Sequence, residues 1–258
     1  MAHRWAVILG VSAGFGAAIA EALAQEGFGI FGVHFDRRAA EPSIRALKER
    51  LAAYNVPVVF RNENAASDDK RQAAIEDLLE RMDDEDTLTV LVHSLAFGTL
   101  RPFAGERAVA RRQMEMTLDV MANSLIYWTR DLCETGRMSA DGRILAMTSA
   151  GSTTVWPNYG PVGVAKAALE ATVRQLAVEL APQGITANAL LAGVTETAAL
   201  RKIPGHEALI EQSRQKNPSG RLTTPHDVAQ LVRVLVRPET HWLTGNVLRV
   251  DGGESIAG

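Results

Sequence analysis

Short apolar runs alternate with longer amphipathic patterns along almost the whole chain. The runs are rich in Val, Ile and Leu, and such alternation is typical of a parallel sheet whose strands are joined by crossover helices. Strands are predicted at Trp5–Leu9, Gly29–His34, Val56–Phe60, Leu88–His93, Arg143–Met147, Thr186–Leu191 and Val247–Val250. Helices are predicted at about Phe15–Glu26, Pro42–Tyr54, Asp68–Met82, Arg107–Thr135, Pro161–Leu180 and Pro225–Val236. Because the 258 residues show no repeat or linker, we expect a single domain, 1–258, of the α/β class with a doubly wound parallel sheet.

The composition excludes several classes of protein. With 47% hydrophobic and 22% charged residues the chain can bury a large core, which rules out a disordered or fibrous protein. Its 27 Lys and Arg against 30 Asp and Glu give a net charge of -3, so it has no basic field to hold nucleic acid. No run reaches the ~18 apolar residues of a membrane span.

The start of the chain and its cysteine content bear on location. The uncharged stretch after Arg4 is similar to a signal peptide, but its glycines lead into an amphipathic pattern at Glu21, as a strand, a turn and a helix would. The single cysteine, Cys133, cannot form an internal disulfide. We therefore expect a cytoplasmic protein with no membrane partner.

A glycine-rich turn follows the first predicted strand. Residues 10–16 read Gly-Val-Ser-Ala-Gly-Phe-Gly and stand directly before a predicted helix. Glycines let the backbone turn tightly and approach a pyrophosphate, whose charge meets the free N–H groups at the helix N-terminus. The spacing differs from the Gly-x-Gly-x2-Gly of the commoner Rossmann form, and an ordinary tight turn is the alternative. In this context Gly10, Gly14 and Gly16 predict a Rossmann-like dinucleotide site.

The residues after the second predicted strand bear on the choice of cofactor. An acid at this place bonds the ribose 2′-hydroxyl of NAD, whereas an arginine accepts the 2′-phosphate of NADP. Asp36 has about the expected spacing from the glycine turn, but the strand is predicted to end at His34, which places Asp36 past the ribose. Arg37 and Arg38 then favour NADPH, with NADH as the second possibility. A solvated turn is an equally open interpretation of the two arginines.

Tyr159 and Lys166 stand at the start of the helix predicted from Pro161, and Ser149 ends the fifth predicted strand. With the glycine turn, this arrangement resembles the short-chain dehydrogenases/reductases. The larger branch of that superfamily spaces its pair as Tyr-x3-Lys, which would require a tyrosine where this chain has Val162. The spacing here is Tyr-x6-Lys, that of a divergent branch whose members include the enoyl-acyl-carrier-protein reductases.

The resemblance extends over nearly the whole chain. Its further segments are His93–Phe97, Leu100–Pro102, Asn158–Leu180, Gly193 with Thr197, and Gly245–Ala257. It implies that the cofactor is also lined by Ser12, Phe15, Asn64, Ala65, Ser94, Leu95, Ala96, Lys166, Gly193 and Thr197. It also implies a homotetramer. Independently, the nearly unbroken apolar character of the helix Pro161–Leu180 predicts a homo-oligomer, with one side of the helix packed on the sheet and the other on another subunit. The alternative is a crowded helix inside a monomer.

The resemblance implies reduction of the double bond of a 2-enoyl thioester on acyl carrier protein or coenzyme A. Hydride arriving at the β-carbon moves negative charge onto the thioester oxygen; Tyr159 would donate to that oxygen, while the Lys166 ammonium holds the nicotinamide ribose. Ser149 either adds a hydrogen bond to the substrate oxygen or caps the strand end. One alternative is a carbonyl or 3-ketoacyl reductase, against which Val162 and Met121 argue, since the larger branch has a relay asparagine at position 121. A non-catalytic NADP-binding sensor is the other.

Two further segments carry predictions. Residues Thr197 to Gln212 form a small amphipathic segment that we expect to be a helical lid over an acyl chain. Arg201 and Lys202 on it either meet an acidic carrier protein or are simply solvated. The acidic run Asp83–Asp86 is predicted as a solvated turn rather than a metal site, because no histidine or further carboxylate stands at ligand spacing. No metal is expected.

Overall fold

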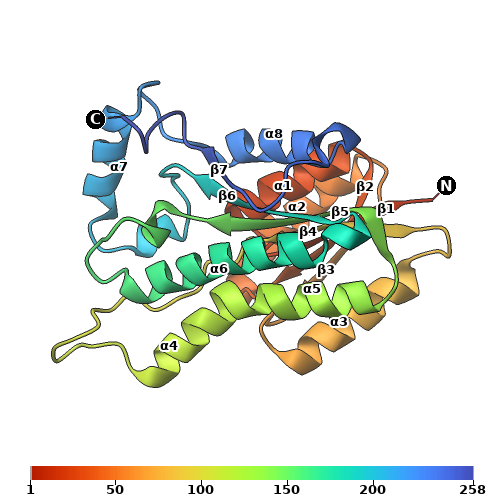
Figure 1. The fold of residues 1–258 in the computed structure, drawn as a ribbon, viewed down its shortest axis with the longest axis horizontal. Helices are drawn as coiled ribbons and strands as arrows, with labels where there is room; N and C mark the ends of the chain where they lie inside the picture. The colour runs from red at the N-terminus through yellow and green to blue at the C-terminus, as the bar shows by residue number, and fades with distance from the viewer. Residues whose placement is uncertain (1, 258) are drawn as a thin grey trace.

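The computed structural model describes residues 2–257, and its strands form a seven-stranded parallel sheet in the order β3-β2-β1-β4-β5-β6-β7. The strands are β1 (Arg4–Leu9), β2 (Phe28–His34), β3 (Val58–Asn62), β4 (Thr87–His93), β5 (Met138–Thr148), β6 (Thr186–Ala192) and β7 (Val247–Val250). The chain starts in the middle of the sheet, runs out to β3, returns to β4 and continues to β7 (Figure 1). The α/β, Rossmann-like, doubly wound sheet is therefore confirmed.

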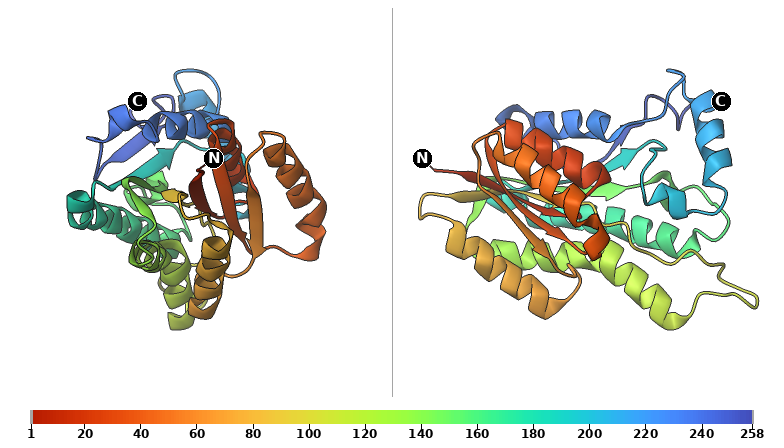
Figure 2. Two further views of the ribbon diagram at one scale, coloured as in Figure 1. Left: turned by 90° about the vertical axis from the view of Figure 1, so that its right-hand side faces the viewer. Right: turned by 180° about the vertical axis from the view of Figure 1, so that it is seen from behind.

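Helices cover both faces of the sheet (Figure 2). They are α1 (Gly14–Gln25), α2 (Glu41–Ala52), α3 (Asp68–Arg81), α4 (Arg111–Leu118), α5 (Ser124–Glu134), α6 (Gly160–Glu179), α7 (His206–Lys216) and α8 (Pro225–Leu235). One core joins α1, α2 and α8 to the sheet, and a second core joins α3, α5 and α6 to the opposite face. Along β1, Ile8 enters the first core whereas Val7 and Leu9 enter the second, since successive strand side chains point to opposite faces.

The long helix expected at Arg107–Thr135 is wrong as a single element. A π-helical turn at Asp119–Asn123 separates α4 from α5. Ser124 bonds both along the helix and across the fold at this turn: its hydroxyl donates to the Val120 carbonyl at 2.9 Å and lies 2.8 Å from Nε2 of the buried His93 on β4. Hydrophobic periodicity does not register such contacts, so the sequence pattern shows an unbroken helix.

Other boundaries differ for local reasons. The third strand is Val58–Asn62 instead of Val56–Phe60, because Pro57 lacks an N–H and contributes only its carbonyl, which accepts from Ile30. The fifth strand begins at Met138, which pairs with Leu88. The pairing register with β4 then shifts between Leu88 and Val90, the latter of which pairs with Arg143. The segment Thr197–Gln212 contains a short 3-10 turn, Leu200–Lys202, and then α7, which runs on to Lys216.

The acidic run Asp83–Asp86 is a turn before β4, as predicted, but Asp86 is not solvated. It is buried, and its carboxylate accepts from the His3 N–H at 2.6 Å and from Trp5 Nε1 at 2.8 Å. These bonds tie the start of β1 to the start of β4. Within residues 2–257 no group of His, Cys, Asp and Glu is arranged to hold a metal ion. No helix in that range is long and apolar enough to cross a membrane.

Candidate active site

The glycine turn lies at the carboxyl end of β1 and is shaped by two close backbone approaches. A Cβ on Gly10 would overlap the Ser94 carbonyl, and a Cβ on Gly16 would overlap the Gly10 carbonyl. Gly10 and Gly14 also have φ of 88° and 57°, which side chains rarely adopt. Leu95 Cδ2 lies 3.5 Å from the Cβ position of Gly10, so the predicted cofactor residues after β4 touch the turn.

The N-terminus of α1 opens beside this turn. Its N-cap is Ala13, and no side chain bonds the first N–H groups. Ser12 and Phe15 are half-buried at this end, whereas Ala96 is exposed. Uncapped N–H groups on a turn with no room for a Cβ at Gly10 or Gly16 fit the pyrophosphate of a dinucleotide.

The end of β2 is held by a small polar cluster. Asp36 Oδ2 lies 3.1 Å from His34 Nδ1, and the Asp36 N–H donates to Asn62 Oδ1 at 3.0 Å. Burial lowers the pKa of His34, while the Asp36 carboxylate opposes this shift. Asp36 is half-buried, whereas Arg37 and Arg38 are exposed and have no ion-pair partner among the residues that the structure covers.

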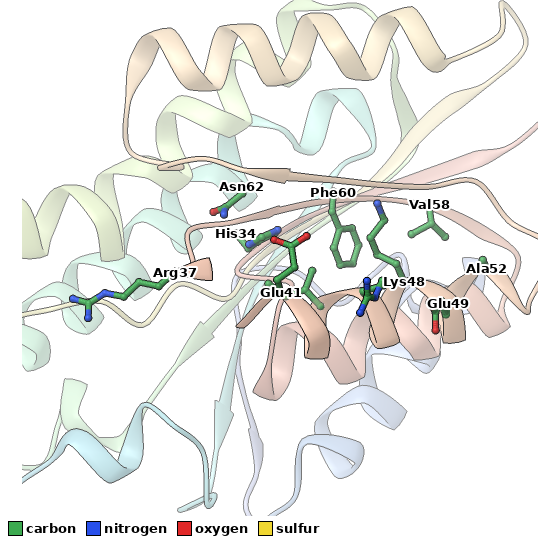
Figure 3. Close-up of a pocket in the computed structure, with 11 residues that line it drawn as sticks. His34, Arg37, Glu41, Lys48, Glu49, Ala52, Val58, Phe60 and Asn62 are labelled. Atoms are coloured by element: carbon green, nitrogen blue, oxygen red, sulfur yellow. The ribbon is translucent and has the colours of Figure 1, made fainter. Parts of the chain in front are cut away.

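A groove of about 550 Å³ lies between α2 and the edge formed by β2 and β3. Figure 3 shows His34 and Asn62 at one end of it and Lys48, beside the ring of Phe60, further along. Its lining includes Arg37 but neither the tyrosine nor the lysine of the predicted catalytic pair. Arg37 is the one predicted cofactor residue in this lining, and Asn64 and Ala65, predicted beside the adenine, are not part of it, so the groove lies apart from the predicted catalytic pair.

Asn64 and Ala65, predicted beside the adenine, form the turn after β3. Asn64 Oδ1 accepts from the Ala66 N–H at 3.0 Å. The Ala65 carbonyl accepts from Nε1 of the buried Trp128 at 2.8 Å, which ties the turn to α5. Ser94 is fixed in a similar way, since its N–H donates to the Leu9 carbonyl at 2.8 Å. Both segments are thus held rigidly at the carboxyl edge of the sheet.

Tyr159 is the N-cap residue of α6, and its hydroxyl lies 3.3 Å from Ser149 Oγ. The predicted placement of Tyr159 just outside the helix agrees with this geometry. The Trp156 ring packs edge-on against the phenol, with ring centroids 5.8 Å apart. Burial raises the pKa of Tyr159, and the hydrogen bond with Ser149 opposes the rise. The phenol is therefore protonated at neutral pH and able to donate.

Lys166 lies on α6 and is buried in the interior. It is 5% exposed, and its ammonium donates to the Met147 carbonyl at 2.7 Å. Burial lowers the pKa of Lys166 to about 8, with Glu170 raising it in part. Burial also lowers the pKa of His93 to about 3, and the Lys166 charge adds to that shift, so His93 is neutral.

The surroundings of Val162 and Met121 are apolar. Met121 lies in the π turn, is 2% exposed and packs with Val162 and Ala165. Both side chains also face Gly98, where a Cβ would come within 2.8 Å of each. The positions at which the larger branch has its tyrosine and its relay asparagine thus form a small hydrophobic cluster.

Gly193 and Thr197 follow β6. Thr197 Cγ2 lies 3.6 Å from the Cβ position of Gly14, which brings the segment over the glycine turn. A Cβ on Gly193 would overlap the Thr223 hydroxyl and come within 2.8 Å of Glu254, so packing against the C-terminal segment already requires glycine there.

Two residues at the site, Glu170 and Thr148, were not predicted from the sequence. Glu170 is buried on α6, and its carboxylate accepts from the Thr148 hydroxyl at 2.7 Å. A signal was present, because Glu170 stands four residues after Lys166 on a helix face that is otherwise apolar. Thr148 carried no signal, since its role depends on a contact across the fold.

Comparison with known proteins agrees with this geometry. A family model described as Enoyl-(Acyl carrier protein) reductase matches residues 10–255. The chain belongs to the enoyl-(acyl carrier protein) reductase family. The curated enoyl-(acyl-carrier-protein) reductase (NADH) FabI of Aquifex aeolicus is 35% identical over 175 residues, which are 67% of this chain and 64% of that protein. FabI of Nostoc is 31% identical over 78% of this chain and 77% of that protein.

A solved enoyl-(acyl-carrier-protein) reductase (NADH), that of Aquifex aeolicus, superimposes with a TM-score of 0.86 at 29% identity, over 100% of this chain and 98% of that one. Both curated relatives are named as NADH enzymes. Membership of the enoyl-(acyl carrier protein) reductase family places the chain among the nicotinamide-dependent oxidoreductases. The NADPH preference expected from Arg37 and Arg38 has no support in these names.

Proposed function

We propose that the protein reduces the double bond of a 2-enoyl thioester, carried on acyl carrier protein or coenzyme A, with hydride from a nicotinamide cofactor. One observation carries the proposal. The Tyr159 hydroxyl, at the N-cap of α6, lies 3.3 Å from Ser149 Oγ, and the buried Lys166 follows on the same helix at Tyr-x6-Lys spacing. The family membership gives this arrangement its chemical context.

The cofactor would lie across the carboxyl edge of the sheet. Gly10, Gly14 and Gly16 with the uncapped start of α1 would hold its pyrophosphate, and Asn64 and Ala65 would flank its adenine. When bound, the cofactor supplies a hydride to the β-carbon of the substrate.

The chain's own groups handle the charge that follows. Negative charge grows on the thioester oxygen, and the protonated Tyr159 hydroxyl donates to it. Ser149, 3.3 Å from that hydroxyl, either holds the phenol in place or adds a second bond to the oxygen. The Lys166 ammonium holds ribose hydroxyls and, by its charge, favours proton loss from the phenol.

Two features support NADH as the preferred cofactor. The half-buried Asp36 carboxylate lies 3.1 Å from His34 Nδ1, and Asn62 bonds the backbone N–H and carbonyl of Asp36. Held in this way after β2, the carboxylate would accept a ribose hydroxyl and repel a 2′-phosphate. The relatives are also named for NADH. Arg37 and Arg38 are free to receive a 2′-phosphate, so the ratio of kcat/KM for the two cofactors decides between them.

An acyl chain would lie against apolar side chains at the mouth of the site. The Phe103 ring packs on Gly160, Trp156 packs on Tyr159, and the segment Thr197–Gln212 would close over them as a lid. Arg201 of this segment is paired with Glu196 at 2.7 Å. Charge reversal at Arg201 and Lys202 together should slow turnover of a carrier-protein thioester but not of a coenzyme A thioester; equal rates with both would remove the carrier role.

The proposal includes a single-domain homotetramer in the cytoplasm. Exposed apolar side chains at Ile126 on α5 and at Val164 and Val178 on α6 support association along these helices. The mass in solution, measured by light scattering, should be four times 27.8 kDa. A monomer mass would contradict this assembly.

The experiment that tests the proposed activity follows the absorbance of NADH and of NADPH with a 2-enoyl thioester and with its β-keto counterpart. Oxidation of the cofactor with the enoyl thioester alone is expected. Oxidation with the keto thioester alone would make the protein a carbonyl reductase despite the apolar Val162 and Met121. Cofactor binding without turnover of either would favour a sensor.

A further inference from the structure

Three consecutive residues at the end of β5 each hold one residue of α6 or its N-cap. The Met147 carbonyl accepts from Lys166 at 2.7 Å, the Thr148 hydroxyl donates to Glu170 at 2.7 Å, and Ser149 lies 3.3 Å from the Tyr159 hydroxyl. The first and third of these contacts involve the predicted catalytic pair. The second joins two residues that the proposed chemistry does not use.

Burying the Glu170 carboxylate costs free energy unless another group compensates its charge. It is 8% exposed, and its Thr148 partner is 5% exposed. A buried carboxylate needs a counter-charge, and Lys166 stands one helical turn away on the same face of α6. The two charges compensate each other inside a helix whose other buried side chains are almost all apolar.

The other groups that face Lys166 do not supply this compensation. From β4 comes the neutral His93, and from β5 the Met147 carbonyl. The π turn packed against α6 contributes the buried side chains of Met121 and Ala122. Glu170 is therefore the one anion next to Lys166 in the described part of the chain.

We propose that Glu170, held in place by Thr148, is a positioning residue that keeps the Lys166 ammonium charged for its role at the cofactor ribose. That role rests on the function proposed above, whereas the effect on the charge does not. Without the carboxylate, burial alone would act on the amine, and Lys166 would lose its proton nearer to neutral pH. Cofactor binding would then weaken on the alkaline side at a lower pH than in the wild type.

The direct test is a titration of the Lys166 amine by NMR in protein labelled with 13C at the lysine Cε. The few lysines make the spectrum simple, and a Lys166→Met spectrum assigns the signal; they are Lys48, Lys70, Lys166, Lys202 and Lys216. The wild-type midpoint should lie near the lowered pKa of about 8. In Glu170→Gln, which keeps an acceptor for Thr148, the midpoint should fall by about one pH unit or more.

Matched variants separate charge from packing. Glu179→Gln removes an exposed carboxylate from the same helix, so the midpoint should not move. Thr148→Val leaves the charge but frees the carboxylate, so it should raise the KM for the cofactor with a smaller change of midpoint, and Thr148→Ser should restore both. An unchanged Lys166 midpoint in Glu170→Gln would overturn the proposal.

A parallel measurement of cofactor affinity against pH distinguishes this proposal from the proposed function. The alkaline loss of affinity should move with the amine midpoint in Glu170→Gln. If the midpoint shifts while affinity does not follow, Glu170 sets the charge of Lys166, but the assignment of Lys166 to the cofactor ribose is wrong. Folding of Glu170→Gln is checked by its circular dichroism.

Discussion

Gly16→Ala tests the cradle for the pyrophosphate most sharply, because the substitution changes only the space available. Gly16 does not have a positive φ, so alanine suits the backbone there. The added Cβ would overlap the Gly10 carbonyl, and Gly10 is itself anchored, since its N–H donates to the Val33 carbonyl at 2.8 Å. The Gly10 and Val33 groups involved are both backbone and cannot rotate away as a flexible side chain would, so α1 has to move away from the turn.

The expected magnitudes follow from this geometry. Overpacking at a rigid site costs about 1–3 kcal/mol of unfolding free energy. Gly16→Ala should lie toward the upper end, because the new Cβ meets the Gly10 carbonyl, a backbone group that cannot rotate away. The free N–H groups of α1 move with the helix. Loss of about 1 kcal/mol of their interaction with a phosphate would raise the cofactor Kd about fivefold.

Gly14 provides the matched control. Its Cβ position has room, with Thr197 Cγ2 at 3.6 Å as the nearest atom, but its φ of 57° disfavours alanine by about 1–2 kcal/mol. Asparagine tolerates that conformation, so Gly14→Asn should be milder than Gly14→Ala, whereas Gly16→Asn should be worse than Gly16→Ala. The assays are denaturant unfolding and titration of cofactor fluorescence. Wild-type stability and affinity in Gly16→Ala would refute the reasoning.

Three further substitutions have expected outcomes. Trp128→Phe leaves the Ala65 carbonyl without its donor, so the unfolding free energy should fall by about 1–3 kcal/mol and the KM for the cofactor should rise; an unchanged KM would separate Trp128 from the adenine turn. Asp36→Ala should raise kcat/KM for NADPH relative to NADH, and no change in that ratio would leave specificity to the arginines. Ser149→Ala should lower kcat, because Ser149 either holds the Tyr159 phenol or bonds the substrate oxygen; unaltered kcat and KM would contradict both roles.

The parts of the fold that depend on repeating patterns could be predicted from the sequence. Alternation of strand and helix patterns predicts the parallel sheet, and the spacing of Tyr159 and Lys166 predicts the family to which the chain belongs. These features are local, because the residues that define them stand close together in the chain.

The parts that depend on contacts between distant segments could not be predicted. The π turn is fixed by Ser124 with His93 of another element, and Asp86 is buried because the first strand delivers His3 and Trp5 to it. Neither contact leaves a periodic trace in the sequence. From the sequence, an acidic run is therefore predicted as solvated, and two helices separated by a π turn are predicted as one helix.

The most direct test of the central claim is Tyr159→Phe, with cofactor affinity and turnover of a 2-enoyl thioester measured on the same preparation. The substitution removes only the hydroxyl that lies 3.3 Å from Ser149 and keeps the ring beside Trp156. Turnover should be lost, while the Kd for the cofactor should stay close to that of the wild type. Turnover at the wild-type rate would show that another group donates to the substrate oxygen and would contradict the role of Tyr159.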